Sequence, residues 1–203
     1  MAASKNEVVL LEVMSILENV RITLSDPRIY DIISRLLHSG NLRLRAMGLR
    51  LLLNTRAYTG DPSLLKTIFS EVADMLTGED VILTDFALDL LLEIAQYPLQ
   101  EELIDDVARV LTLVKNLALN EKLGLSDKAR LVVEKLEDAI YRFYKNRPED
   151  AKQKIHELLI NESFYEAIDL ALAVGDTYVL NWLVQELERM EKERLKINER
   201  ILP

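Results

Sequence analysis

Residues 61–93 read DPSLLKTIFSEVADMLTGEDVILTDFALDLLLE, and this stretch shows the pattern from which the fold is predicted. Asp61-Pro62 is a helix-start signal, because the Asp side chain accepts from exposed N–H groups and proline loses no hydrogen bond in a first turn. Apolar side chains then recur at helical spacing up to a turn at residues 77–80. A second, almost entirely apolar helix follows, so the stretch predicts a helical hairpin.

The same start signal recurs at near-equal intervals through the first half of the chain. Asp26-Pro27, Asp61-Pro62 and Tyr97-Pro98 place their prolines 35 and 36 residues apart. Residues 48–54, GLRLLLN, also align with residues 87–93, ALDLLLE, at an offset of 39. Self-similarity with such a period is typical of arrays of helical hairpins.

The apolar periodicity predicts helices along nearly the whole chain. They are expected over about 5–24, 27–37, 42–55, 62–76, 81–97, 100–119, 126–147, 149–161, 164–174 and 177–200. Gly40 suits a left-handed cap after the second of these helices, and Asn41 is the expected N-cap of the third. Ser126 and the capping box from Ser163 to Glu166 are expected to start two later helices.

Composition favours an all-α protein. The 203 residues are 49% hydrophobic and only 6% aromatic, with six glycines and five prolines. The chain has no cysteine, which excludes disulfides, thiolate metal sites and a Cys nucleophile. No uncharged apolar run approaches the roughly 18 residues of a membrane helix, and we expect a soluble, cytoplasmic protein. The abundance of Leu, Ile, Glu and Lys is also a tendency of proteins from heat-loving sources.

Charge is arranged in bands along the chain, although the net charge is −9. Residues 1–60 hold eight Lys or Arg against five Asp or Glu, whereas residues 61–106 hold Lys66 against twelve acids. Residues 107–147 hold nine bases against five acids, and residues 148–203 hold seven against twelve. When each repeat contacts only its neighbours, bands along the sequence become bands in space.

Signals for catalysis or for a bound cofactor are not found in the sequence. His38 and His156 are the only histidines, and neither has the Glu three residues earlier that di-iron helix bundles use. HExxH, Walker-loop, GxGxxG and GxSxG motifs do not occur. We therefore expect a protein that is not an enzyme and that has no cofactor and no metal.

The only strongly polar stripe on the helix expected over 81–97 consists of Asp85, Asp89 and Glu93, at i, i+4 and i+8. Like charges at this spacing destabilise a helix by roughly 0.2–0.5 kcal/mol per pair, so helix stability does not explain the stripe. Arg50 occupies the position equivalent to Asp89 in the preceding hairpin. The stripe is either one side of an ion pair between repeats or an acidic groove for a basic partner segment.

Residues 141–147, YRFYKNR, interleave aromatic and basic side chains. Tyr141, Arg142, Tyr144, Lys145 and Arg147 could supply ring faces for stacking and cations for phosphates, as single-stranded nucleic-acid contacts require. The alternative is a helix C-terminus, where basic residues interact favourably with the macrodipole and aromatic residues join the buried face.

The first third of the chain is rich in arginine. Helical repeats can grip nucleic acid with such a face, to which Arg43 and Arg45 would belong. The alternative is solvated helix faces that pair with the neighbouring acidic band. The arginines are these: Arg21, Arg28, Arg35, Arg43, Arg45, Arg50 and Arg56.

The last expected helix carries Leu183, Leu187, Met190, Ile197 and Ile201 at alternating spacings of four and three, with Arg194 at the missing position. A seam of this period can form a coiled coil, and a homodimer through this helix is one interpretation. The other is that the seam packs on the preceding helix.

A family resemblance rests on the first turns of the helices that end each hairpin. The residues are Arg43, Arg45, Ala46, Leu49 and Leu52 in one hairpin, and Asp80, Ala87, Leu88 and Leu91 in the next. Over roughly residues 26–119 the chain resembles HEAT repeats and their armadillo relatives. The resemblance implies a curved scaffold that binds proteins, or sometimes nucleic acid, along the surface lined by the second helices.

These observations predict an all-α, right-handed α-solenoid of about ten antiparallel helices. Residues 1–147 are expected to form the HEAT-like body, and residues 148–203 a C-terminal helical hairpin on the same solenoid, with the last helix protruding. The expected function is a non-catalytic scaffold that binds another protein, one with a basic segment, through its acidic band. The alternative is a nucleic-acid-associated repeat protein, and no membrane association is expected.

Overall fold

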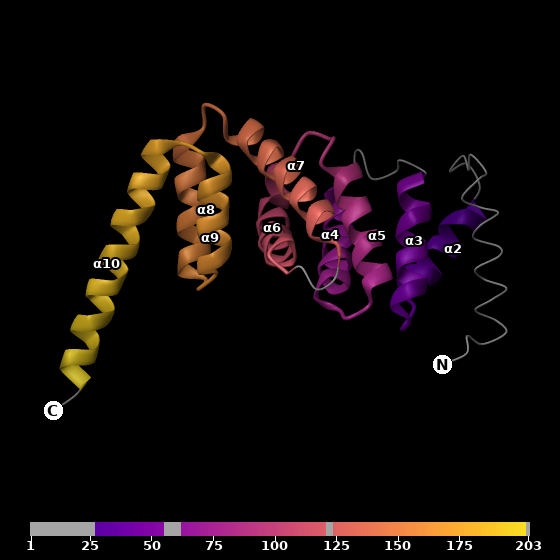
Figure 1. Ribbon diagram of the computed structural model, residues 1–203, viewed down its shortest axis with the longest axis horizontal. Helices are drawn as coiled ribbons and strands as arrows, with labels where there is room; N and C mark the ends of the chain where they lie inside the picture. Colours follow the sequence, from indigo (N-terminus) through magenta and orange to yellow (C-terminus); the bar gives the residue numbers. More distant parts are fainter. Residues whose placement is uncertain (1–26, 55–61, 121–123, 202–203) are drawn as a thin grey trace. The chain divides into compact units, whose positions relative to one another are not determined.

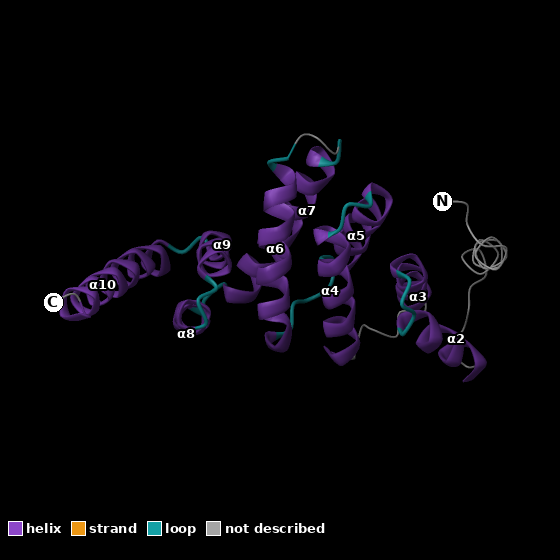
Figure 2. Cartoon of the chain, turned by 90° about the horizontal axis from the view of Figure 1, so that it is seen from below, coloured by secondary structure: helices purple, strands orange, loops and turns teal. Residues whose placement is uncertain are grey.

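The computed structural model describes residues 27–54, 62–120 and 124–201, with side chains from residues 31–53, 63–120 and 124–194. Within these ranges the chain consists of helices joined by short connections and contains no strand, which confirms the all-α class (Figure 2). The helix expected over residues 5–24 lies outside the described residues. None of the described helices is both long enough and apolar enough to span a bilayer.

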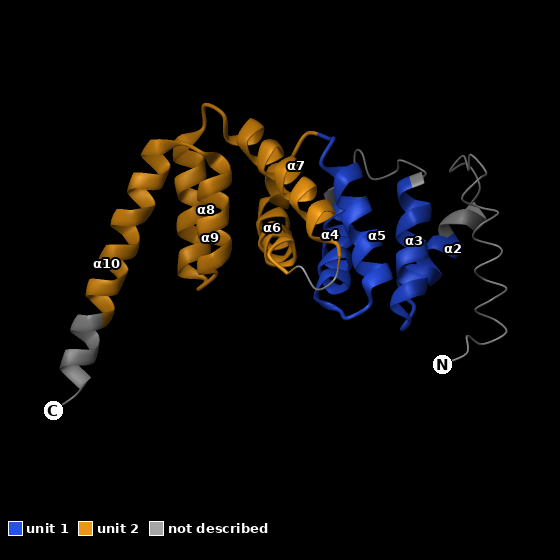
Figure 3. Cartoon of the chain, in the orientation of Figure 1, with its two compact units in different colours: residues 1–97 blue, residues 98–203 orange. Residues whose placement is uncertain are grey.

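The chain forms two compact units, residues 1–97 and residues 98–203 (Figure 3). This division differs from the expected boundary after residue 147. It falls at Tyr97-Pro98, the third of the evenly spaced proline signals.

The first unit contains two helical hairpins (Figure 1). One is formed by α2, Pro27–Leu37, and α3, Leu42–Asn54; the other is formed by α4, Pro62–Thr77, and α5, Val81–Ile94. Helix α3 packs against α2 and also against both α4 and α5, so the second helices of the two hairpins are neighbours.

Helices α3 and α5 are buried on most sides, as their sequences predict. Leu51, Leu52 and Leu53 follow one another in α3 and are each at most 2% exposed. Since successive residues of a helix point about 100° apart, three consecutive buried side chains require neighbours on several sides. In α5 the buried residues are Leu83, Thr84, Ala87, Leu88, Leu90, Leu91 and Ile94.

The carboxylate of Asp80 both caps α5 and bonds to α3 of the preceding hairpin. Asp80 is the N-cap of α5, and its Oδ1 accepts from the N–H groups of Ile82 and Leu83 at 3.0 and 3.4 Å. Its Oδ2 accepts from Nη2 and Nε of Arg43, in the first turn of α3, at 2.8 and 3.2 Å. The hydrogen bond from Arg43 holds the pKa of Asp80 below its usual range. We call this arrangement the Asp80 clamp.

The helix ends test the expected caps. Asn41 caps α3 as predicted, since its Oδ1 accepts from the N–H of Arg43 at 2.9 Å. The left-handed cap at Gly40 is wrong, because the positive-φ glycines of the described residues are Gly124 and Gly175. The turn after α2 is closed instead by Ser39, whose Oγ accepts from the N–H of Asn41 at 3.1 Å.

Two further caps differ from expectation in the second half of the chain. Ser163 precedes α9 but its side chain makes no capping hydrogen bond, so the predicted capping box is wrong. Ser126 is the first residue of α7, and Leu125 occupies the cap position. The turn before residue 177 is built by Gly175, which has φ 66°, and by Asp176, whose Oδ1 accepts from the N–H of Tyr178 at 2.8 Å.

The second unit begins with a 3-10 turn, η2 (Glu101–Leu103), and continues through five α-helices. They are α6 (Ile104–Ala118), α7 (Ser126–Tyr144), α8 (Pro148–Ile160), α9 (Phe164–Val174) and α10 (Thr177–Ile201). Helix α9 packs against α8 and also against α6 and α7, while α10 packs on α8 and α9. The contacts of α9 therefore place α6 and α7 in one unit with the C-terminal helices.

A polar cluster fixes α9 against α6 and α7. Lys115 Nζ, on α6, lies 2.9 Å from Asp169 Oδ1 on α9 and 2.9 Å from Glu137 Oε1 on α7. Thr112 Oγ1 donates to Asp169 Oδ2 at 2.7 Å. All four side chains come from helix faces that also carry buried apolar residues, so this cluster orients a contact that apolar packing stabilises.

We predict that replacing Asp80 with Ala lowers the free energy of unfolding by about 1–2 kcal/mol, because the variant loses both an N-cap and a charged partner of Arg43. Urea unfolding followed by circular dichroism measures this loss. The matched control is Glu79→Ala at the exposed neighbouring position, with an expected change within about 0.5 kcal/mol. Equal losses in the two variants would contradict a role for the clamp.

The clamp also gives a signed pH dependence. Because folding lowers the pKa of Asp80, its charge adds stability above the pKa of the unfolded chain, and this stability is lost as pH falls through the folded value. The stability difference between wild type and Asp80→Asn should therefore be present at neutral pH and shrink below pH of about 4.

Candidate interaction surface

Beyond the exposed Val81 and Ile82 of its first turn, helix α5 leaves only a narrow strip open to solvent. Between residues 85 and 93, Asp89 is exposed, and the remaining members of the strip are partly exposed. We call this surface the α5 strip: Asp85, Phe86, Asp89, Leu92 and Glu93. Its carboxylates lie along one face, with one aromatic and one aliphatic side chain between them.

Arg50 reaches the α5 strip from α3. Its guanidinium carbon lies 5.7 Å from the centroid of the Phe86 ring, one turn before Asp89. A cation over an aromatic face at this distance contributes about 0.5–1 kcal/mol at an exposed site. Asp85, Asp89 and Glu93 each have a polar or electrostatic partner of their own, so the strip is a set of engaged charges with which a ligand would have to exchange contacts.

Two of the arginines of α3 pair with acids of the next hairpin. Arg43 forms the Asp80 clamp, and Arg45 Nε lies 2.7 Å from Glu71 Oε2 on α4, with its Nη2 3.5 Å from Asp74 Oδ2. The Arg45 and Glu71 side chains are only 24% and 17% exposed. This pairing agrees with the interpretation of arginine faces that neutralise the neighbouring acidic band. Arg21, Arg28 and Arg56 have side chains outside the described residues.

The segment over 141–147 ends a helix and turns most of its side chains inward or into ion pairs. Tyr144 is 5% exposed, so its ring face is covered, and Phe143 contacts it edge to face with centroids 4.9 Å apart. Arg142 Nε lies 3.2 Å from Asp138 Oδ2. Tyr141 and Lys145 are exposed. The structure therefore leaves one ring of the predicted stacking surface accessible.

Arg147 makes contacts that the sequence did not suggest. Its Nε donates to Asp150 Oδ2 at 2.6 Å and its Nη2 to Glu101 Oε2 at 3.2 Å. Its guanidinium carbon lies 4.7 Å from the centroid of Phe143. Hydrogen bonds to the two carboxylates raise the pKa of Arg147, and the bond to Asp150 contributes more than the bond to Glu101. Arg147 to Asp150 has the i, i+3 spacing of a local pair, but Glu101 is 46 residues away and no sequence signal identifies it.

The described half of the C-terminal seam is only partly buried. Leu183 is 4% exposed, whereas Leu187 and Met190 are partly exposed and Arg194 is exposed. The side chains of Ile197 and Ile201 lie outside the described residues. The seam thus packs on the unit at its beginning, and the idea of a dimer through its end stays a prediction.

Side chains of α8 hold the first half of α10. Lys152 Nζ donates to Tyr178 Oη at 2.9 Å and lies 4.5 Å from that ring's centroid and 5.6 Å from that of Trp182. His156 Nδ1 lies 3.3 Å from Glu186 Oε1, and its ring meets Trp182 edge to face. His156 and Trp182 therefore have a structural role in the contact between α8 and α10.

No group of three or more His, Cys, Asp or Glu side chains in the described part of the chain is arranged to hold a metal ion. Comparison of the chain with models of protein families, with curated proteins and with solved structures finds no match. The function is therefore inferred from the side chains that this chain places together.

Proposed function

We propose that this protein is a non-catalytic scaffold that binds a basic segment of another protein along the α5 strip. The observation that carries the proposal is the strip itself. Three carboxylates stand at i, i+4 and i+8 on a helix whose other side chains between residues 83 and 94 are buried, apart from Phe86 and Leu92, which lie between the carboxylates. A partner helix with basic and apolar residues on one face would match both kinds of group.

The energetics of the strip support a role in binding. Like charges at i, i+4 destabilise a helix by roughly 0.2–0.5 kcal/mol per pair, and Asp85, Asp89 and Glu93 form two such pairs. The first unit already has the Asp80 clamp and the Arg45 pairs to connect its hairpins. A row of like charges complements a basic ligand and increases its rate of encounter.

The scaffold we propose is a right-handed α-solenoid of HEAT-like hairpins. Support comes from the first unit, where α3 lies next to α5 and the helix pairs follow the period of the proline signals. In such an array the second helices line one surface, and α5 is one of them.

The contacts of the basic residues give less support to the nucleic-acid alternative. Arg43, Arg45, Arg142 and Arg147 each have a carboxylate partner, and the Tyr144 ring is covered. Phosphate binding would have to displace these pairs on a protein of net charge −9.

We predict no measurable binding of a fluorescent single-stranded oligonucleotide at physiological ionic strength, because the paired cations offer the phosphates little positive potential. Fluorescence anisotropy makes the test. Saturable binding that is lost in Tyr141→Ala with Lys145→Ala would instead favour the nucleic-acid function, since these are the exposed members of the segment.

We predict that the combined variant Asp85→Asn, Asp89→Asn, Glu93→Gln binds a basic amphipathic helix, a labelled peptide of Lys and Leu, roughly 3-fold to 100-fold more weakly than wild type. The range follows from about 0.2–1 kcal/mol for each exposed ion pair lost. The melting temperature should stay the same or rise slightly, because two repulsive pairs are removed. Anisotropy titration and thermal unfolding measure the two quantities.

The matched control neutralises three exposed acids of the second unit, Glu102→Gln, Glu162→Gln and Glu193→Gln. It removes the same net charge and should leave peptide affinity within about twofold of wild type, since long-range attraction is screened at physiological salt. Equal weakening by both variants would show non-specific charge attraction and would contradict the assignment of the strip.

A further inference from the structure

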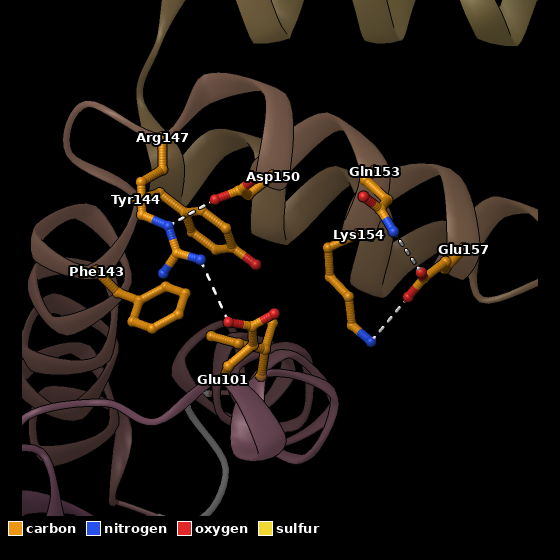
Figure 4. A pocket seen from close by; sticks show the side chains of 9 residues that line it. Glu101, Phe143, Tyr144, Arg147, Asp150, Gln153, Lys154 and Glu157 are labelled. Atoms are coloured by element: carbon orange, nitrogen blue, oxygen red, sulfur yellow. Dashed lines mark hydrogen bonds and ion pairs between the residues drawn. The ribbon is translucent and has the colours of Figure 1, made fainter.

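A polar cleft of about 150 Å³ lies within the second unit, where η2, the end of α7 and the start of α8 meet (Figure 4). Its walls come from segments far apart in sequence. The lining residues are Glu101, Ile104, Phe143, Tyr144, Arg147, Asp150, Gln153, Lys154 and Glu157. The cleft is separate from the α5 strip, and the inference below does not rest on the proposed function.

The backbone between α7 and α8 builds one wall of the cleft. Helix α7 ends at Tyr144, and Asn146 adopts φ 70°, in the left-handed region that asparagine tolerates better than most residues. Pro148 then begins α8 with no loss of a hydrogen bond. This tight connection places Arg147 over Phe143 and next to Tyr144 (Figure 4).

Two cations stand at the cleft, and each is already held by two carboxylates. Arg147 is bonded to Asp150 and Glu101, as described above. Lys154 Nζ lies 2.7 Å from Asp105 Oδ2 and 3.1 Å from Glu157 Oε2. Four carboxylates thus surround two cations. Carboxylate acceptor sites exceed cationic donors, since each carboxylate offers about four lone-pair sites, whereas Arg has five N–H donors and Lys has three.

The Tyr144 hydroxyl takes no part in these ion pairs and hydrogen bonds. The residue is 5% exposed, lines the cleft, and forms no side-chain hydrogen bond within the described residues. Its oxygen points into the space between Glu101 and Lys154 (Figure 4). Burial raises the pKa of this phenol, so it stays protonated at neutral pH. The oxygen faces the cleft and is not sealed in the protein interior, so a ligand group in the cleft can replace water as its hydrogen-bond partner.

The charges that act on the hydroxyl indicate the class of ligand. The carboxylates of Glu101, Asp105, Asp150 and Glu157 surround the two cations Arg147 and Lys154, so the cleft carries a surplus of negative charge. This surplus of negative charge disfavours an anion, and the polar walls disfavour an apolar molecule. A cation with N–H donors can bond the phenol oxygen, while the phenol O–H remains free to donate to a carboxylate.

We propose that this cleft binds a compact organic cation with N–H donors, an alkylammonium or guanidinium group, with Tyr144 Oη as one of its acceptors. The group belongs either to a free amine or to a Lys or Arg side chain of a polypeptide. The chemistry at the cleft is the same in both cases.

The test is an NMR titration of the full chain with n-butylammonium chloride, with amide signals of residues 143–157 as the readout. We expect saturable shifts there, and none with tetramethylammonium chloride at equal ionic strength, because that cation lacks N–H groups. Tyr144→Phe removes only the hydroxyl and should weaken binding about tenfold, as loss of one hydrogen bond to a charged group does. Tyr141→Phe, on the exposed face of the same helix, is the matched control and should bind like wild type.

Absence of saturable shifts with n-butylammonium, equal shifts with tetramethylammonium, or unchanged affinity in Tyr144→Phe would each overturn the proposal. If Tyr144→Phe does not fold, Glu101→Gln at the exposed edge of the cleft takes its place, with an expected severalfold loss of affinity. A short peptide with capped ends whose only charged side chain is one lysine distinguishes the sources. Tighter binding of the peptide than of n-butylammonium indicates a polypeptide ligand, and equal or weaker binding indicates a free amine.

Discussion

Burial of α5 on nearly every side is the constraint on which the rest of the first unit depends. Seven of its residues are buried between α3 and α4, and burial of a Leu or Ile side chain stabilises the fold by about 1.5–3 kcal/mol. The helix must therefore be held at a fixed position in its groove, and the Asp80 clamp does this at its first turn. A helix so enclosed has few positions left for polar residues. The positions that remain form the α5 strip, so the function we propose follows from the packing.

The arrangement of charge follows the same logic. The basic residues of α3 face the acidic residues of the next hairpin. Arg43 and Arg45 neutralise part of that negative charge through ion pairs within the unit. The Arg45–Glu71 pair is largely covered, the Arg43–Asp80 pair is more exposed, and both connect α3 to the next hairpin. The second unit uses ion pairs in the same way, at Lys115 between three helices and at Arg147 and Lys154 around the polar cleft.

Local signals in the sequence predicted most of the helices and the two hairpins of the first unit. The Asp-Pro starts and apolar periodicity placed α2 to α5 within a few residues, because these signals depend on the first turn and one helix face. The caps at Gly40 and Ser163 were wrong, since several short polar residues compete for the same turn and local sequence does not decide which one bonds. The division at Tyr97-Pro98 depends on how α9 packs against α6 and α7, which no local pattern records.

The candidate sites were predictable to different degrees. The carboxylate spacing in α5 and the position of Arg50 could be read from the sequence, but the contact of Arg50 with Phe86 requires the structure. The polar cleft was missed because the sequence left open whether the aromatic residues of 141–147 are exposed or join the buried face, and only the structure shows that Tyr144 is buried. Glu101 and Lys154 reach the cleft from segments about fifty residues apart, and only tertiary packing brings them together.

The central claim is that the α5 strip receives a basic partner segment, and a charge exchange tests it most directly. Two peptides of Lys and Leu are used, and they differ in that one has its central lysine replaced by glutamate. The affinity of each peptide is measured for the wild-type protein and for Asp89→Lys. The account predicts that Asp89→Lys weakens binding of the all-lysine peptide and that the glutamate-containing peptide recovers part of that loss. If the ratio of the two peptide affinities is the same on both proteins, Asp89 does not contact the ligand and the claim is contradicted.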